Sequence, residues 1–287
     1  MSTRNAPAPA TAPPTPPGPD VVAAYDHLAP LVARYWGPDL HYGYWSGPED
    51  DTPIAAATAR LTALVVERLG VGPGGRVLDL GCGHGAAAVA TAVRTGAEVV
   101  GVDVNPRALA DARRAADLAG VADQVTLVEC DALGTPFPDG SFDAVLAFES
   151  TPHFALSELF PEIARLLRLN GRLVIETPFL RTPMNDGLRR RVAEFFTILG
   201  MTALETADTH FRLLRDVGLD LAEFVDITDH VAGSFTRLVA RLREHRPDLE
   251  REYGAAEAER VTRTFADWAK VPELAHMILV ARRVDAA

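Results

Sequence analysis

Three aspartates stand at the ends of three successive apolar runs that resemble β-strands. Asp79 lies in RVLDL, Asp103 lies in GVDV and Asp131 follows VEC. Helical stretches separate these runs, and the carboxyl ends of parallel strands meet along one edge of a sheet, where open α/β sheets bind ligands. Gly81 and Gly83 follow the first run and let the backbone approach a ligand closely. We therefore expect the three carboxylates to line one crevice beside a glycine bend.

The glycine bend is compatible with two kinds of cofactor. Gly81-x-Gly83-x-x-Ala86 satisfies the relaxed dinucleotide fingerprint. A pyrophosphate is an anion that prefers bare amides at a helix N-terminus, and Asp79 would repel it. The same carboxylate would attract an ammonium group, which S-adenosylmethionine (SAM) carries together with a nearby sulfonium. The position of Asp79 therefore favours SAM over a nicotinamide dinucleotide.

The next two acids suit the nucleoside part of either cofactor. Asp103 follows Gly81 by 22 residues and could accept hydrogen bonds from both ribose hydroxyls. Asp131, next to Ala132, could accept one from an adenine amine. We expect Val104, beside Asp103, to line the same site.

The order of apolar runs and helical patterns predicts an α/β fold. Continuous Val, Ile and Leu runs separated by helices of 10–15 residues indicate a parallel sheet covered on both faces. We predict a doubly wound, mostly parallel, seven-stranded Rossmann-like sheet with a helical cap. The expected strands are 76–80, 98–104, 124–132, 142–150, 172–178, 221–228 and 275–283.

Composition changes along the chain suggest four segments. Residues 1–20 hold seven prolines and are expected to form a disordered leader. The other expected segments are an N-terminal helical lid at 21–69, a cofactor-binding core at 70–178, and at 179–287 the remaining core strands with helical cap insertions at about 180–207 and 230–270.

Bulk properties exclude several classes of partner. The chain has 287 residues, 48% of them hydrophobic, and a formal net charge of −11, which would repel a nucleic-acid backbone. It has no apolar run of membrane-spanning length and no secretory signal pattern. Cys82 and Cys130 form neither a disulfide framework nor a metal-ligand pattern. We expect a cytoplasmic protein without a metal, a monomer or homodimer, that acts on a small molecule.

Four motifs together resemble the class I SAM-dependent methyltransferases. They are VLDLGCGHG (77–85), VVGVDVNP (99–106), VECDA (128–132) and FPDGSFDAVLAFES (137–150), within a resemblance that covers roughly 70–178. It implies SAM as cofactor and S-adenosylhomocysteine (SAH) as product. The residues it implies are Asp79, Gly81 and Gly83 around the methionine moiety, Asp103 on the ribose, and Asp131 with Ala132 at the adenine.

The remaining segments resemble one subgroup of that family. YDHLAP and YWGPDLHYGYW (within 25–45), ESTPH (149–153) and FADWAKVPELAHMILVARR (265–283) are similar to sugar O-methyltransferases of bacterial natural-product pathways and to tocopherol-type C-methyltransferases. In that subgroup the N-terminal segment closes over SAM, which implies contacts from Tyr25 and from His41, Tyr42 and Gly43. Alternatively, this aromatic run only fixes the cap to the core.

The run that follows the fourth expected strand supplies candidates for the reacting end. His153 has a suitable pKa for a general base that takes a proton from an acceptor hydroxyl. The alternative is a histidine that only caps the next helix. We expect Phe148 and Glu149 to contact the cofactor, although Glu149 could equally be a structural carboxylate.

Two positions depart from the sugar-methylating pattern, which resembles E-S-x-H-H-M with an aspartate near the end of strand five. Pro152 replaces the first histidine, and Glu176-Thr177 stands where the aspartate is expected. Glu176 could replace that aspartate by a shift of one residue, so we count it with His153 as a catalytic candidate.

The sequence thus predicts a methyltransferase of secondary metabolism, with oxygen preferred over carbon as the acceptor atom. One alternative is a cyclase that keeps SAM without methylating. Another is a prenyl-diphosphate C-methyltransferase, for which the run at 189–191 offers three arginines that could equally face solvent. Asp79 and the lack of a hydride-transfer pair argue against a dehydrogenase, and a helical cap is unnecessary for a pure binding module.

Overall fold

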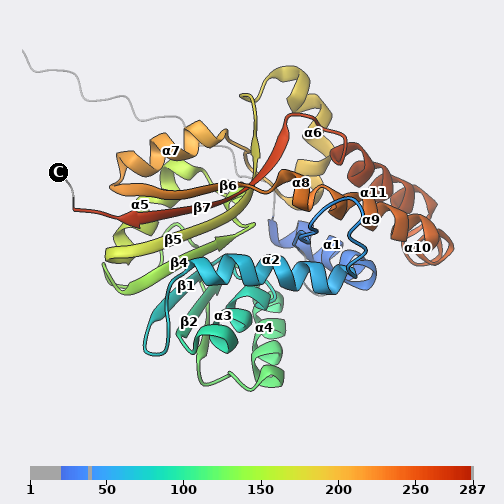
Figure 1. Cartoon of the computed structure of the whole chain (residues 1–287). Coiled ribbons are helices and arrows are strands. Elements are labelled where there is room, and N and C mark those ends of the chain that lie inside the picture. Colours follow the sequence, from blue (N-terminus) through green and yellow to red (C-terminus); the bar gives the residue numbers. More distant parts are fainter. Residues whose placement is uncertain (1–20, 38–40, 286–287) are drawn as a thin grey trace, which may run out of the picture.

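The computed structural model describes residues 21–37 and 41–285, so the expected leader at 1–20 lies outside it. Its centre is one seven-stranded sheet in the order β3-β2-β1-β4-β5-β7-β6 (Figure 1). β7 runs antiparallel to β5 and β6, and the other pairs are parallel. The strands are β1 (Arg76–Leu80), β2 (Glu98–Asp103), β3 (Val125–Glu129), β4 (Phe142–Phe148), β5 (Leu167–Leu180), β6 (Leu219–Asp226) and β7 (Leu274–Arg283). The predicted fold class is confirmed.

Neighbouring residues of each strand point to opposite sides of the sheet. Both sets of side chains are apolar in the central strands, and helices therefore cover both faces. Val77 packs toward the layer of α2 (Ile54–Arg68), α3 (Ala86–Thr95) and α4 (Pro106–Ala119). Leu78 and Leu80 pack toward the layer of α5 (Leu156–Leu166) and α7 (Ala207–Asp216). All three side chains are fully buried.

The glycine bend after β1 brings the backbone close to the next helix pair. Gly81, Gly83 and Gly85 all have positive φ, which glycine adopts without steric cost. A Cβ on Gly85 would lie 2.6 Å from the Cβ of Ala112 in α4. The bend is therefore fixed by backbone conformation and by close contact between α3 and α4.

The remaining helices form a cap at the carboxyl end of the parallel strands (Figure 1). They are α1 (Val21–Tyr35), α6 (Asp186–Leu199), α8 (Thr228–Val231), α9 (Gly233–Glu244), α10 (Arg246–Tyr253) and α11 (Ala255–Trp268). α1, α6 and α9 to α11 share one hydrophobic cluster. The expected insertions at 180–207 and 230–270 contain α6 and α9 to α11.

One part of the expected lid at 21–69 differs in the structure. The helix α2 lies on the sheet face, where Leu61 and Val65 are completely buried in the same cluster as Val77 and Val99. Its apolar face is wide enough to complete the layer of α3 and α4. The cap side of the molecule therefore receives α1, the segment from His41 to Trp45 and the first turn of α2, whose Ile54 and Ala57 belong to the hydrophobic cluster of the cap.

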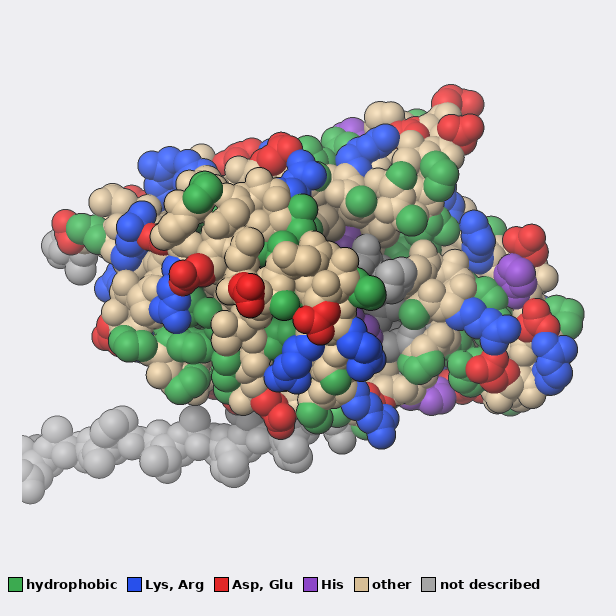
Figure 2. Space-filling view, turned by 90° about the horizontal axis from the view of Figure 1, so that it is seen from below, with side chains coloured by type: hydrophobic (Ala, Val, Ile, Leu, Met, Phe, Trp, Pro, Cys, Tyr) green, Lys and Arg blue, Asp and Glu red, His purple; other side chains and the backbone are tan. Residues whose placement is uncertain are grey.

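The surface carries charges of both signs. On the face in Figure 2, Lys and Arg side chains lie among Asp and Glu side chains. Within residues 21–37 and 41–285, no helix is long and apolar enough to cross a bilayer.

We predict that Gly85→Ala destabilises the fold by about 2 kcal/mol, because it places a Cβ at positive φ and against Ala112. Thermal unfolding followed by circular dichroism measures the loss. Gly134→Ala is the control, since a Cβ there meets nothing within 4 Å. Equal melting temperatures for the two variants would contradict the proposed close contact.

Candidate active site

A cavity of about 390 Å³ lies at the carboxyl ends of β1 to β4, and we call it the larger cavity. Its walls include the glycine bend, the starts of α3 and α4, and the first helix of the cap. The predicted cofactor residues that line it are Tyr25, His41, Asp79, Gly81, Gly83, Asp103, Val104, Asp131, Ala132, Phe148 and Glu149.

Asp79 is a buried carboxylate on the wall of the larger cavity. Its side chain is 2% exposed, and its Oδ2 has no hydrogen-bond partner among the described residues. Burial, with a smaller contribution from the charge of Asp103, raises its pKa to about 7. A cation that entered the cavity would supply the missing partner and stabilise the ionised form.

Two backbone amides orient the carboxylate of Asp103 on the wall of the larger cavity. Its Oδ2 accepts a hydrogen bond from Gly83 N at 2.8 Å, and its Oδ1 accepts one from Asn105 N at 2.8 Å. Asn105 in turn caps α4, since its side chain accepts from Arg107 N and Ala108 N. Each oxygen of the fixed carboxylate keeps capacity to accept a further bond from a ligand hydroxyl.

Asp131 lies at the end of the larger cavity next to β3. Its Oδ1 accepts a hydrogen bond from Leu133 N at 2.9 Å, and its side chain is exposed. Ala132 beside it is buried. The pair therefore places a polar group beside an apolar surface at this end of the larger cavity.

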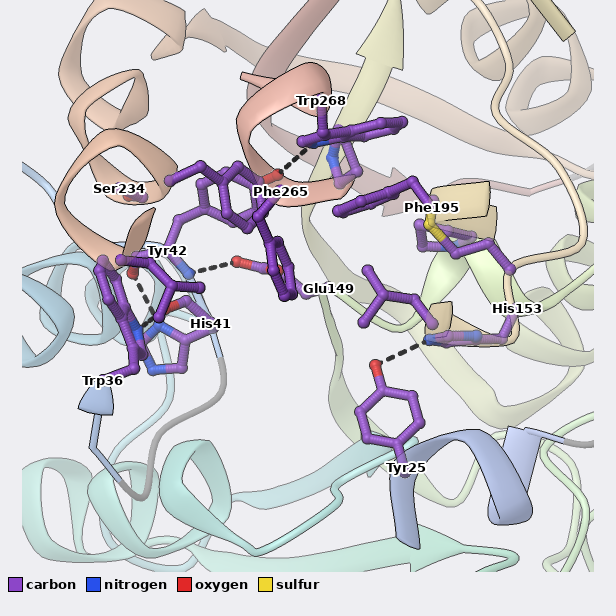
Figure 3. A pocket seen from close by; sticks show the side chains of 16 residues that line it. Tyr25, Trp36, His41, Tyr42, Glu149, His153, Phe195, Ser234, Phe265 and Trp268 are labelled. Carbon is purple, nitrogen blue, oxygen red and sulfur yellow. Dashed lines mark hydrogen bonds between the residues drawn. The ribbon is translucent and has the colours of Figure 1, made fainter. Parts of the chain in front are cut away.

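A second cavity of about 80 Å³ lies between the sheet and the cap, and we call it the smaller cavity (Figure 3). Most of its wall is aromatic or aliphatic, contributed by Trp36, Phe195, Leu199, Met201, Phe235, Leu238, Phe265 and Trp268. Phe195 of α6 and Trp268 of α11 stack with ring centroids 3.7 Å apart. No Lys or Arg belongs to the described lining.

Four side chains line both cavities: Tyr25, His41, Glu149 and His153. They come from α1, from the segment before α2, and from the turn after β4, so distant parts of the sequence meet here (Figure 3). We call this place the junction. Any group that moves from one cavity to the other must pass these four side chains.

The hydrogen bonds of His153 define its tautomer. Nδ1 lies 3.1 Å from the carbonyl oxygen of Gly200, which can only accept, so Nδ1 carries the proton. Nε2 therefore has a lone pair, and it accepts from the hydroxyl of Tyr25 at 3.2 Å. Burial lowers the pKa of His153 below its ordinary value, so the imidazole is neutral at pH 7.

Glu149 has an unusual backbone and a buried carboxyl group. Its φ of 52° lies in the left-handed region that non-glycine residues seldom adopt, and such strain is concentrated at functional sites. Its Oε1 accepts a hydrogen bond from Tyr42 N at 2.7 Å, which fixes the segment before α2. Burial raises its pKa to about 8.

Glu176 lines neither cavity in the described structure. It is completely buried in the middle of the sheet, where burial and the charge of Glu149 raise its pKa well above the ordinary value. Its Oε1 lies 3.4 Å from His276 Nδ1. The sequence predicts that Glu176 replaces the strand-five aspartate of the sugar-methylating pattern by a shift of one residue, but the structure does not place its carboxyl group in either cavity. Its position beside Glu149 would instead allow it to support that residue.

Tyr42 and Gly43 also differ from the expected contacts. Tyr42 lines only the smaller cavity, where its hydroxyl accepts from Trp268 Nε1 at 3.2 Å. Gly43 lines neither cavity, and a Cβ there would lie 2.5 Å from the ring of Trp45. Its backbone donates to Ser234 Oγ at 3.1 Å, so it joins the segment to α9.

The aromatic wall of the smaller cavity contains residues that the sequence analysis did not single out. Phe195, Phe265 and Trp268 lie on helices whose apolar residues recur at helical spacing, as in any buried helix face. The sequence holds no signal that separates a cavity wall from a packed core. Among the described residues, no group of three or more His, Cys, Asp or Glu side chains could hold a metal ion.

Known proteins resemble this chain over most of its length. A family model described as "Methyltransferase domain" matches residues 78–175. "Methyltransferase GfsG" of Streptomyces halstedii is 33% identical over 258 residues, which cover 90% of this chain and 91% of the relative. "27-O-demethylrifamycin SV methyltransferase" of Amycolatopsis mediterranei is 32% identical over 270 residues, which cover 93% and 97%.

Solved structures show the same architecture. The [4+2]-cyclase SpnF is 26% identical with a TM-score of 0.82, and the match covers 96% of this chain and 100% of that structure. The cyclopropane synthase MmaA2 from Mycobacterium tuberculosis, 19% identical over 93% of this chain and 99% of its own, has a TM-score of 0.82 and shares the fold. The glycine bend, the strand-end acids and these relatives show that the chain belongs to the class I SAM-dependent methyltransferases and is related to those of natural-product biosynthesis.

Proposed function

We propose that this enzyme binds SAM in the larger cavity and methylates a hydroxyl group of a neutral, apolar natural product whose reacting end enters the smaller cavity. The observation that carries the proposal is the neutral imidazole of His153 at the junction, with its Nε2 lone pair available to a hydroxyl donor. We further propose that the reaction takes place in the cytoplasm, as the sequence predicts.

The chemistry of the larger cavity fits SAM. The unpartnered Oδ2 of buried Asp79 suits the α-ammonium group, and the fixed carboxylate of Asp103 suits the ribose hydroxyls. Asp131 and Ala132 suit the adenine. When bound, SAM supplies a methyl group on a positively charged sulfur, which makes the methyl carbon open to attack.

The lining of the smaller cavity supports an uncharged acceptor. The free energy of an apolar molecule falls when it leaves water and packs against an aromatic wall such as that of Phe195 and Trp268. A diphosphate would need cationic partners, and the described wall has none. The arginines at 189–191 do not line the cavity, and Arg191 pairs with Glu273. These observations favour a hydroxylated polyketide or terpenoid over a prenyl diphosphate.

His153 is suited to take the proton of the acceptor hydroxyl. The acceptor would replace Tyr25 as the donor to Nε2, while the bond from Nδ1 to Gly200 keeps the ring oriented. Nε2 would accept the hydroxyl proton during the transfer, which would make the acceptor oxygen a better nucleophile toward the methyl group that bound SAM would supply. The four side chains of the junction are partly buried, which limits the access of water to the reacting groups. The name of the Amycolatopsis relative supports oxygen as the acceptor atom.

We predict that Asp79→Asn weakens binding of SAM and of SAH by about 10-fold or more, because both ligands carry the ammonium that a charged carboxylate binds. Isothermal titration calorimetry measures both affinities. In the wild type, both ligands should bind more tightly as pH rises through about 7, because Asp79 then ionises. The variant should lose this contribution.

Asp123→Asn, on an exposed loop, is the control and should bind as the wild type does. Wild-type protein that binds neither SAM nor SAH but takes up NAD or NADP would contradict the proposed cofactor. An Asp79→Asn variant with unchanged affinities would remove Asp79 from the ammonium site.

We predict that His153→Ala lowers turnover by roughly 100-fold or more, because the proton of the acceptor loses its base. The assay follows methyl-labelled SAM with hydroxylated polyketides, among them 27-O-demethylrifamycin SV, the compound in the relative's name. The dissociation constant for SAM should change little, since the ring meets the cofactor only at the junction.

Two outcomes would contradict this proposal. An unchanged rate in His153→Ala would remove the base role. Product that forms without label transfer and without SAH would instead indicate a cyclase, which the likeness to the [4+2]-cyclase makes the alternative to test. Tyr25→Phe is the comparison variant, because it removes the competing donor to Nε2 and leaves the imidazole in place.

A further inference from the structure

Methyl transfer changes the charge of the cofactor, because the positive sulfonium of SAM becomes the neutral thioether of SAH. The ammonium, ribose and adenine are the same in both. An enzyme that reads only those three groups would bind substrate and product alike. Selection between them requires a group that senses either the methyl group or the charge at the sulfur atom.

We propose that the Glu149 carboxylate at the junction recognises the sulfonium charge, so that the enzyme binds SAM more tightly than SAH and releases its product. This inference rests on the proposed binding of SAM in the larger cavity. Its basis is the position of Glu149 on the walls of both cavities.

The route of the methyl group determines where the sulfur must lie. In the proposed reaction the methyl group would pass from the larger cavity to the smaller one, so the sulfur of bound SAM would lie beside the residues of the junction, which line both cavities. Among these, Tyr25, His41 and His153 carry no negative charge, and Glu149 is the acid. Asp79 and Asp103 line only the larger cavity, as binding sites for the unchanged groups require.

Glu149 is held in place without a cationic partner from the described chain. Its Oε1 accepts from Tyr42 N, and its neighbour Glu176 is another acid, whose side-chain hydrogen bond to Glu149 partly offsets the effect of burial on the pKa of Glu149. None of the interactions that determine its protonation comes from a Lys or Arg. A buried carboxylate in this state is unstable unless it is neutralised or meets a cation, and a sulfonium is such a cation.

The protonation of Glu149 should therefore follow the charge of the ligand. Burial raises its pKa to about 8, so much of it is protonated at pH 7 before a ligand binds. A cation lowers that pKa and releases a proton, whereas a neutral thioether does not. The titratable groups that surround Glu149 are Tyr25 of α1, His41 and Tyr42 before α2, Asp103 of β2, His153 after β4, Glu176 of β5 and His276 of β7.

The test is Glu149→Gln, which removes the charge and keeps an oxygen that can accept the Tyr42 N–H. Calorimetry with SAM, SAH and sinefungin measures three affinities, since sinefungin carries an amine cation where SAM has its sulfonium. We expect SAM and sinefungin to bind about 10-fold more weakly or worse, and SAH to change less than about 3-fold. Equal weakening of SAM and SAH would overturn the proposal and indicate that Glu149 only fixes the segment before α2.

Two variants serve as matched controls. Asp79→Asn should weaken SAM and SAH together, because it removes a partner of the shared ammonium group. Glu158→Gln, an exposed change on α5, should alter neither. Wild-type protein that binds neither SAM nor SAH would contradict the proposed function itself, a result distinct from failure of the Glu149 proposal.

A second measurement needs no variant. Calorimetry in buffers of different ionisation enthalpy counts protons released on binding. At pH 7, we expect the wild type to release more protons with SAM than with SAH. Asp79 contributes equally to both ligands, so the difference belongs to the group beside the sulfur. Equal proton release would overturn the inference even if Glu149→Gln did not fold.

Discussion

Two buried carboxyl groups without a cationic side chain beside them are the constraint on which the site depends. Asp79 and Glu149 lie at the carboxyl edge of the sheet, and burial raises the pKa of both. Fixed backbone bonds nevertheless keep the neighbouring Asp103 oriented toward the same cavity. Protein cores seldom retain carboxyl groups in this state unless a ligand completes them. A cationic ligand of the kind proposed above would supply the missing partner of both groups.

The sheet and the cap contribute different kinds of side chain to the two cavities. The sheet edge presents polar groups at fixed positions, because β1, β2 and β4 pair in a continuous parallel register. The cap presents an apolar wall from α6, α9 and α11, which pack together through Phe195, Phe235, Phe265 and Trp268. Among the described residues, four side chains line both cavities, and the proposed chemistry takes place beside them.

The sheet half of the molecule could be predicted from the sequence, because its signals are local. Strand runs, glycines at positive φ and the acids Asp79 and Asp103 stand next to one another in the chain, so their spacing indicates their position. The pocket of the cap could not be predicted in the same way. Phe195 and Trp268 lie far apart in the sequence and meet only through tertiary packing. Glu176 shows the same limit, since its distance from an acceptor depends on how deeply β5 is buried.

The cap is assembled from three separate segments: α1 before the sheet begins, α6 after β5, and α8 to α11 between β6 and β7 (Figure 1). Each segment enters and leaves the sheet at fixed points, and none of them carries Asp79, Asp103 or Asp131. Exchange of α6 or α9 to α11 with the matching insertion of a relative would therefore reshape the smaller cavity, the proposed acceptor site, while the sheet edge that lines the larger cavity stays intact. The acceptor specificity of such a fold could therefore change, in evolution or by engineering, through replacement of cap helices without changes in the proposed SAM-binding site.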